Sequence, residues 1–526
     1  MLLVLMGLFR LVLGSAKTER WIPAALAISL LLILLGNCTA EPPVPEHPGV
    51  SVAVMYCGNC HLVPDPADLP INIWRDEVLP KMGAFLGRYG NRNRKHFLVN
   101  LKTAPYLRSL YPEDAIIDSS DWALLRDYYL TTAPEAAPLT PEPAAIRKMK
   151  QFSVHPITVA GEEAAAPYTT MIEFDATRQE IIVGAAGRQS GRLRTFNQRH
   201  ELIAAQAVDS APADLDPASG TLLTMGSLVP SDLPRGKVSQ YVKDSTIVLL
   251  DTLARPVQMI RLDLDQDGVR ELIVAEFGNM AGALNVYLPA KDGKFHFQRS
   301  LRARSGAIRL RAVDLDGDGW KDLISLFGQG DESVIVFYSR PGGTEAKVLL
   351  RFPPSYGSSD LEVVDMNDDG HPDLVCTNGD NFDYPPFPKT YHGVRVYEND
   401  GTDNFTEVMF FHLDGAYNVE AADFDGDGDV DLAVVAYFVP EHLRPTHSFV
   451  YLKRSWGLGS YNFKPAGFRK PSGVHFLTMT QGDVDQDGDI DLLIGNFAAY
   501  LPDGIVSDVK KEGPLPVYLF LENETY

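Results

Sequence analysis

Short apolar runs recur along the second half of the chain, each directly after a cluster of acidic residues. Residues 271–277 read ELIVAEF, and comparable runs begin at residues 322, 373, 431 and 491. A loop and a second run follow each of them, such as ALNVY at 283–287. Runs of this length that are rich in β-branched residues and bounded by turn residues predict β-strands. We therefore expect about four short strands in each repeat, as in a propeller blade.

The acidic cluster before each run has one repeated form. The five copies read DLDQDGVREL, DLDGDGWKDL, DMNDDGHPDL, DFDGDGDVDL and DVDQDGDIDL, and their first aspartates are separated by 51, 51, 58 and 60 residues. A regular period of this size predicts an array of repeated supersecondary units.

Each copy places oxygen-bearing side chains at loop positions 1, 3, 5 and 9 and a glycine at position 6, which is the chemistry of a calcium loop. An EF-hand would need Glu at position 12, where this chain has Val274, Ser325, Cys376, Val434 and Ile494. The loops therefore predict about five Ca²⁺ sites between strands. The predicted ligands are Asp263, Asp265, Asp267, Glu271, Asp314, Asp316, Asp318, Asp322, Asp365, Asn367, Asp369, Asp373, Asp423, Asp425, Asp427, Asp431, Asp483, Asp485, Asp487 and Asp491.

These motifs, together with the Phe-Gly pairs at 277–278 and 327–328, resemble the FG-GAP or VCBS repeats of integrin α-chain propellers and of many exported bacterial proteins. The resemblance implies a mainly β fold. Degenerate copies around Asp175 and Asp214 bring the predicted number of blades to seven. The last blade lacks an outer strand, so we expect residues 150–158, KQFSVHPIT, to complete it and close the ring.

The amino-terminal segment differs from the rest of the chain. Three basic residues precede the apolar run WIPAALAISLLLILL at 21–35, which predicts an export signal. The segment that ends at Cys38 resembles a bacterial lipoprotein cleavage box, although Asn37 departs from it. We expect lipidation of Cys38 and an extracytoplasmic, membrane-anchored protein; an uncleaved anchor and simple cleavage stay open.

The hexapeptide YCGNCH at 56–61 contains the C-x-x-C-H signature of covalent c-type haem attachment. Cys57 and Cys60 would form the thioethers, and His61 would be the proximal iron ligand. A structural zinc site would need a second pair of ligands, and a thioredoxin-like dithiol would need a βαβ context. Neither is present in the sequence around the motif.

Residues 47–134 resemble a small class I cytochrome c, which implies an all-α domain before the propeller. The resemblance implies a methionine ligand on the other side of the iron, for which Met82 is the candidate and His96 the alternative. Core filling by Met82 is the structural alternative. Ser119, Ser120 and Asp121 predict the start of the final helix.

The expected domains are a signal or anchor (1–37), a Pro-rich tether (38–50), a monohaem cytochrome c domain (51–134), a Pro/Ala-rich linker (135–148) and the propeller (149–526). The formal net charge of −22 argues against nucleic acid as a partner and suits bound cations. Three long insertions follow equivalent strands and should lie on one face as a ligand site or a dock for the haem domain. Their candidate residues are Tyr384, Phe387, Tyr391, His392, His442, His447 and Tyr500.

Three functions fit this organisation. The favoured one is an electron carrier, without catalysis of its own, whose propeller docks a redox partner protein. An adhesion or glycan-binding propeller with an accessory haem is the first alternative, and its analogy rests on the fold alone. A haem-containing subunit of an extracytoplasmic dehydrogenase is the second.

Overall fold

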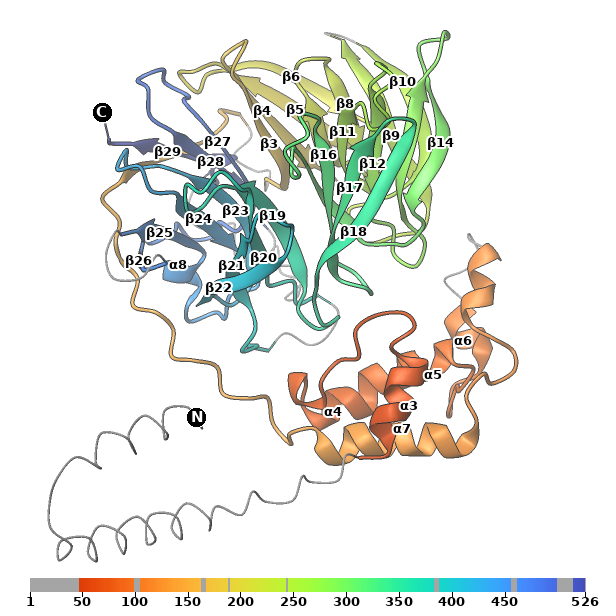
Figure 1. The fold of residues 1–526 in the computed structure, drawn as a ribbon. Helices are drawn as coiled ribbons and strands as arrows, with labels where there is room; N and C mark the ends of the chain where they lie inside the picture. Colours follow the sequence, from red (N-terminus) through yellow and green to blue (C-terminus); the bar gives the residue numbers. More distant parts are fainter. Residues whose placement is uncertain are drawn as a thin grey trace, which may run out of the picture.

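The computed structural model describes residues 47–525 apart from 99–104, 162–166, 188–189, 243–244, 383–386, 456–460 and 499–513. A small helical part precedes a ring of seven β-sheets and lies against one side of it (Figure 1). The export segment and Cys38 lie outside the described residues. Within the described residues, no helix has the length and apolarity needed to cross a bilayer.

Eight helical segments make up the helical part. They are α3 (Gly49–Tyr56), the 3₁₀ turn η2 (Pro66–Asp68), α4 (Ile71–Ile73), the π-helical turn η3 (Trp74–Val78), α5 (Leu79–Phe85), α6 (Arg94–Leu98), the 3₁₀ turn η5 (Pro105–Leu110) and α7 (Ser119–Thr132). Helices α3 and α7 cross at Gly49, where a Cβ would lie 2.4 Å from the Leu124 carbonyl oxygen. Glycine therefore permits the close helix packing.

The N-cap of α7 differs from the sequence-based prediction. The Asp118 side chain accepts hydrogen bonds from the Asp121 N–H at 2.8 Å and from the Ser120 hydroxyl at 2.7 Å. Asp118 has an extended backbone and precedes the helix, so it is the cap in place of the serines. On the same helix Leu125 and Tyr129 are buried against Trp74, and they form the core of the helical part.

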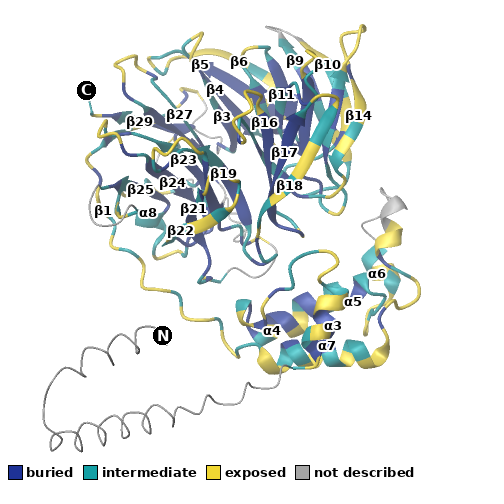
Figure 2. Cartoon of the chain, viewed as in Figure 1, coloured by how far each residue is buried: buried dark blue, intermediate teal, exposed yellow. Residues whose placement is uncertain are grey.

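Seven antiparallel sheets form the propeller blades, and their burial is shown in Figure 2. Blades one and two contain β3 (Thr169–Asp175), β4 (Glu180–Ala186), β5 (Gly191–Phe196), β6 (Leu202–Val208), β7 (Pro212–Asp216), β8 (Thr221–Thr224), β9 (Pro234–Val242) and β10 (Ser245–Ala254). Blades three and four contain β11 (Pro256–Leu262), β12 (Glu271–Glu276), β13 (Ala283–Pro289), β14 (Phe295–Arg302), β15 (Ala307–Val313), β16 (Asp322–Phe327), β17 (Ser333–Arg340) and β18 (Gly343–Arg351). Blades five to seven contain β19 (Ser358–Val364), β20 (Asp373–Asn378), β21 (Gly393–Asn399), β22 (Phe405–His412), β23 (Ala416–Ala422), β24 (Asp431–Ala436), β25 (Phe449–Arg454), β26 (Phe463–Gly467), β27 (Phe476–Gly482), β28 (Asp491–Asn496) and β29 (Tyr518–Asn523); the short helix α8 (Arg444–His447) precedes β25.

The predicted apolar runs become the second strand of each repeat. Strands β12, β16, β20, β24 and β28 are buried along their whole length because neighbouring blades cover both faces. The first strand of every blade, which lies nearest the axis, has a register shift after its first residue or residues. A bulge at this point changes which side chains face the axis.

The ring is closed by a strand from the other end of the chain. Strand β2 (Phe152–Ile157) pairs antiparallel with β29, so blade seven has the order β2-β29-β28-β27. This confirms the predicted role of residues 150–158. A short strand that the sequence did not predict, β1 (Arg147–Lys148), pairs in parallel with β26 on blade six.

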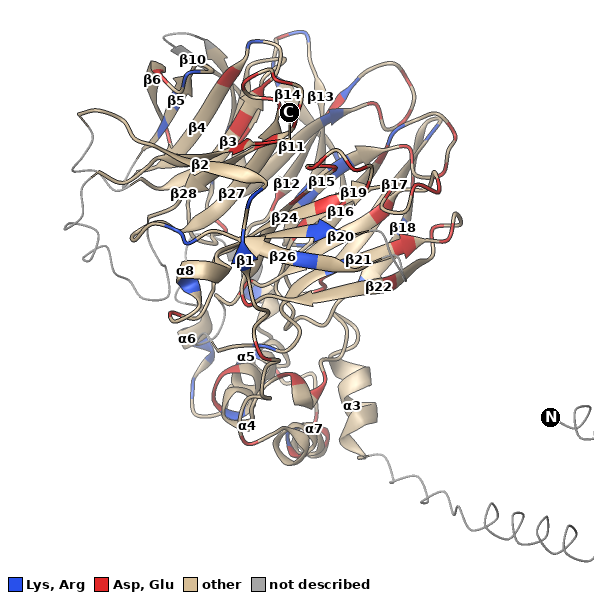
Figure 3. Cartoon of the chain, turned by 90° about the vertical axis from the view of Figure 1, so that its left-hand side faces the viewer, with Lys and Arg blue, Asp and Glu red and all other residues tan. Residues whose placement is uncertain are grey.

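The strand order fixes two opposite faces of the ring. The acidic loops join the first and second strands on one face, which we call the loop face. The long insertions join the second and third strands on the other, which we call the insertion face. In Figure 3 acidic segments mark loops at the edge away from the helical part. The insertions therefore share a face, as expected.

Replacing Phe152 tests the closing strand. Its ring is 5% exposed and contacts Phe424 and Tyr451, each at 5.6 Å between ring centroids. We expect Phe152→Ala to lower the free energy of unfolding of the propeller by about 3–5 kcal/mol, because it leaves a cavity at the seam. Denaturant unfolding followed by circular dichroism measures this loss.

The matched control is His155→Ala on the same strand. Its side chain is 47% exposed and paired with Glu522, so the expected loss is below about 1 kcal/mol. Equal losses for the two variants would contradict a closing role for β2.

Candidate functional site

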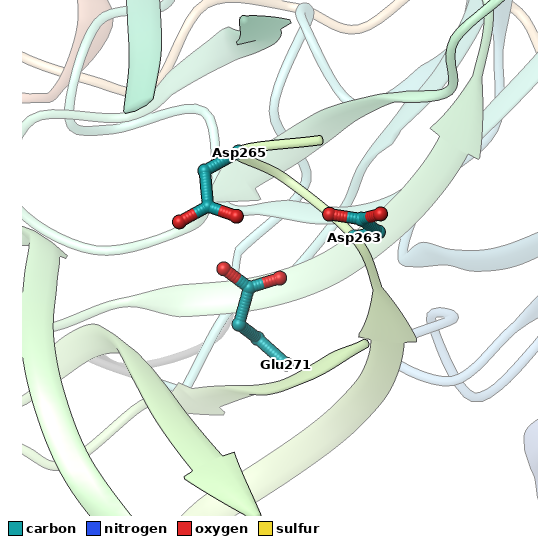
Figure 4. A group of neighbouring side chains, drawn as sticks. All are labelled: Asp263, Asp265 and Glu271. Atoms are coloured by element: carbon teal, nitrogen blue, oxygen red, sulfur yellow. The ribbon is translucent and has the colours of Figure 1, made fainter. Parts of the chain in front are cut away.

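The acidic loops bring carboxylates together on the loop face. Figure 4 shows Asp263, Asp265 and Glu271 directed toward one another. In four of the loops, three carboxylates offer oxygens that all lie within 4.8 Å of one another. The four groups are Asp263–Asp265–Glu271, Asp314–Asp316–Asp322, Asp423–Asp425–Asp427 and Asp483–Asp485–Asp491.

The glycine at loop position 6 has the backbone conformation that the motif predicts. Its φ angle is +88° at Gly268 and +100° at Gly488, and it is also positive in the other three loops. Its N–H donates to the first aspartate of the loop, for example from Gly268 to Asp263 at 3.0 Å. A residue with a Cβ would be strained at this position.

The acidic residue at position 9 has a role that the motif alone did not reveal. Asp322 accepts the Leu315 N–H at 3.0 Å with one oxygen and the Ser339 N–H at 2.8 Å with the other. It therefore connects the loop to the third strand of the blade. Asp373 and Asp491 make equivalent pairs of bonds. Burial raises the pKa of Asp322 to about 6.

Unpartnered oxygens indicate that the loops fit a cation. The buried atoms Asp265 Oδ1, Glu271 Oε1, Asp314 Oδ1 and Asp483 Oδ1 have no hydrogen-bond partner. Leaving a buried carboxylate oxygen unpaired costs free energy, and a hard cation with oxygen ligands would remove that cost. These loops could therefore hold Ca²⁺.

The five loops are not equivalent. Arg340 contacts Asp316 at 2.7 Å and Asp318 at 3.1 Å, and Lys453 pairs with Asp425 and Asp427. A cation that binds in these two loops must displace the basic side chain or share the carboxylates with it.

The loop at Asp365 forms no group of three carboxylates in the described chain. Asn367 replaces an aspartate in this loop, and its amide donates to Asp369 at 3.0 Å.

The C-x-x-C-H motif follows α3 without a break. The Cys57 carbonyl accepts hydrogen bonds from the Cys60 N–H at 3.1 Å and the His61 N–H at 3.4 Å, so the motif turns like a helix. His61 Nδ1 lies 2.6 Å from the Leu62 carbonyl oxygen. A carbonyl oxygen can only accept, so Nδ1 is the donor in this contact, and in the neutral imidazole Nε2 then has the lone pair. Cys57 and Cys60 are free thiols, and burial raises the pKa of Cys57 to about 11.

The two candidate distal ligands lie in different surroundings. Met82 is on helix α5 rather than in a loop, and it packs against the same apolar cluster as Cys57. His96 is exposed on α6 beside Phe97, which belongs to a separate cluster around Ala84 and Tyr111.

The helical part packs against the insertion face of the propeller. Arg304 Nη1 donates to the Cys60 carbonyl at 2.9 Å, Ser355 Oγ to Asp68 at 3.0 Å and the Tyr391 hydroxyl to the Asp68 carbonyl at 3.3 Å. Phe387 packs on the helical core. Burial is the main cause that raises the pKa of Asp68 to about 6.

The insertion residues proposed from the sequence therefore do not form one site. Phe387 and Tyr391 contact the helical part, whereas His447 contacts the linker through the Ala144 carbonyl at 3.2 Å. His392 is buried and His442 is exposed. Tyr384 and Tyr500 lie outside the described residues. No sequence motif pointed to Asp68, Ser355 or Arg304, because contacts between domains leave no local pattern.

The model of the FG-GAP-like repeat family matches residues 263–325, 314–376 and 378–434, which include four of the acidic loops. These stretches are similar to the FG-GAP-like repeat. They form part of a seven-bladed propeller, in agreement with the sequence-based prediction. No curated protein matches the chain.

Solved structures with a similar outline include *Saccharomyces cerevisiae* Sqt1 (8% identity, 72% of this chain, 99% of that chain, TM-score 0.41). A protein from *Lactobacillus plantarum* is 14% identical over 57% of this chain and 85% of its own, with a TM-score of 0.38. The WD40 domain of SCAP from fission yeast is 11% identical over 71% of this chain and 98% of its own, with a TM-score of 0.38.

Calcium removal tests the acidic loops of the FG-GAP-like repeats. We expect a chelator to lower the melting temperature, because a cation that binds only the folded state stabilises it by about 2.7 kcal/mol at a concentration 100 times its Kd. Asp265→Ala should remove one bound ion in calorimetric titration and lower the free energy of unfolding by a similar amount.

Asp292→Asn is the control, because Asp292 is an exposed carboxylate between β13 and β14 and outside the loops. A melting temperature that the chelator leaves unchanged would contradict the calcium prediction.

Proposed function

We propose that this protein is an extracytoplasmic, membrane-anchored electron carrier, in which a monohaem c-type domain is held on a calcium-stabilised propeller. The observation that carries the proposal is the state of His61 within the C-x-x-C-H motif. Its Nδ1 donates to the Leu62 carbonyl, so in the neutral imidazole Nε2 would offer its lone pair to iron. Both thiols of the motif are free.

The residues around the motif fit a haem. Cys57 and Cys60 would bind the porphyrin covalently and His61 would bind the iron, while the haem would supply reversible one-electron chemistry. Met82 is supported as the distal ligand because it packs on the same apolar cluster as Cys57, whereas His96 is exposed and contacts Phe97 of another cluster. The apolar residues Trp74 and Leu79 in that cluster would exclude water from the haem.

The propeller contributes a fixed position for the haem domain. The hydrogen bond from Arg304 to the Cys60 carbonyl joins the attachment motif itself to the insertion face. The buried contacts at Asp68 and Phe387 add polar and apolar area to the same interface. The remaining surface of the propeller is then available to a redox partner protein, and Cys38 would attach the assembly to the membrane.

Covalent haem attachment is directly measurable. In a host that matures c-type cytochromes outside the cytoplasm, we expect the peptide with residues 57–61 to carry the mass of one haem and the protein to show a Soret band. Cys57→Ala with Cys60→Ala should lose both signals while the propeller keeps its calcium-dependent melting. Wild-type protein with neither signal would overturn the proposal.

The distal ligand is tested by Met82→Ala. Loss of a thioether ligand should abolish the weak long-wavelength sulfur-to-iron band of the oxidised protein and lower the reduction potential. Met55→Ala is the matched control, because Met55 is 61% exposed on α3. A band that survives in Met82→Ala and disappears in His96→Ala would assign the alternative ligand.

A further inference from the structure

A cavity that is open to solvent runs along the axis of the propeller. The first strands of all seven blades contribute to its wall, and its volume is about 510 Å³. This is within the range of about 300–1,000 Å³ that pockets for small molecules occupy. The axial cavity is separate from the acidic loops on the loop face and from the C-x-x-C-H motif.

Two arginines in the wall, Arg309 and Arg311, are paired with carboxylates, whereas Arg255 donates to the Leu228 carbonyl and lies over the Phe277 ring. Arg309 donates to Asp360 at 2.5 Å, and Arg311 donates to Glu362 at 2.5 Å and 3.2 Å. Asp360 also accepts the amide of Asn418 and the N–H of Val419 at 3.0 Å. These pairs join blades four, five and six around the axis and leave their positive charge compensated.

Two carboxylates of the wall have no such partner. Glu173 on β3 and Glu420 on β23 make no hydrogen bond or ion pair within the described part of the chain, and both line the cavity. Both side chains are partly exposed to the cavity, and two carboxylates that face one space repel each other unless they are protonated or joined by a positive charge.

Buried amide oxygens give a second, independent indication. Asn418 is 5% exposed and lines the cavity, yet its Oδ1 has no partner although its amide nitrogen donates to Asp360. Gln329 Oε1 is likewise unpartnered, while its nitrogen donates to the Asn279 carbonyl at 2.6 Å. All of these side-chain oxygens without a hydrogen-bond partner can accept hydrogen bonds. The missing group must therefore donate hydrogen bonds.

The lining of the cavity differs from that of the acidic loops. Across the described residues, the convergent groups of three carboxylates all belong to the acidic loops, and none includes Glu173 or Glu420. The end of the cavity toward the insertion face is lined by aromatic residues, among them Phe382, Phe438 and Phe497. Aromatic faces attract organic cations and accommodate hydrocarbon groups.

We propose that the axial cavity binds a small organic ammonium ion. The ammonium group donates to Glu173, Glu420 and Asn418 Oδ1, and the hydrocarbon part lies among the aromatic residues near the insertion face. This ligand site requires no haem and does not depend on the proposed electron transfer.

The charges around the two glutamates make the affinity for the ammonium ion depend on pH. Burial is the main cause that raises the pKa of Glu173 to about 8, with Asp214 raising it further and Arg311 and Arg309 lowering it. Burial also raises the pKa of Glu420 well above its ordinary value; Glu362, Asp360 and Glu173 add to this and Arg311 opposes it. An ammonium ion requires the charged carboxylates, so binding releases protons and its affinity rises with pH up to the pKa of Glu173.

The test is calorimetric titration of the full chain, saturated with calcium, with phenethylammonium and with its neutral analogue phenethyl alcohol. We expect binding of the cation alone, with proton release and an affinity that increases from pH 6 to pH 8. Glu420→Gln and Glu173→Gln should each weaken binding about tenfold or more, since a charge-assisted hydrogen bond is lost. Asp292→Asn should leave it unchanged.

Three results would overturn the proposal. They are equal affinity for the amine and the alcohol, no binding of the amine by wild-type protein at pH 8, and displacement of the amine by added calcium through a further metal site. The comparison of the two ligands uses wild-type protein, so it stands even where a glutamine variant fails to fold.

Discussion

Closure of the ring by β2 is the constraint on which the rest of the structure depends. Seven sheets enclose an axis only if the last is joined to the first, and here the joining strand comes from residues ahead of blade one. Six antiparallel residue pairs between β2 and β29 connect the two ends of the propeller. The same closure places β1 on blade six and fixes the end of the linker, because Arg147 pairs with Ala466. The helical part is therefore attached close to the seam.

The distribution of negative charge follows from this architecture. The chain contains 69 acidic and 47 basic residues, and many of the acidic ones occupy the loops of the FG-GAP-like repeats. In four of the loops, three carboxylates converge, an arrangement that a bound cation would stabilise; Arg340 and Lys453 supply positive charge at two of them. At the axis, Arg309 and Arg311 provide it for Asp360 and Glu362, and only Glu173 and Glu420 are left without a partner in the described chain. The converging carboxylates of the acidic loops suit hard metal ions. The two glutamates at the axis suit a larger cation.

The opposite faces of the propeller carry different chemistry because antiparallel strands alternate in direction. Loops between first and second strands carry the acidic residues. Loops between second and third strands, and those between blades, meet the helical part through Phe387, Ser355 and Arg304. A proposed haem site next to the insertion face and the proposed calcium sites on the loop face are thus separated by the thickness of a blade. The axial cavity lies between the two faces.

The sequence determined the features that are encoded by adjacent residues. The acidic loops, the buried strands after them and the C-x-x-C-H motif each occupy about ten residues or fewer, so local geometry follows from local chemistry. The number of blades and the closing strand also followed, because a repeat with a missing strand predicts where that strand must come from. The cap at Asp118 and the helical position of Met82 were not predicted, since helix boundaries depend on competing local bonds. Only the tertiary structure brought Glu173 to Glu420, Arg309 to Asp360 and Asp68 to Ser355, because these residues are distant in sequence and become neighbours only when the ring closes and the helical part packs against it.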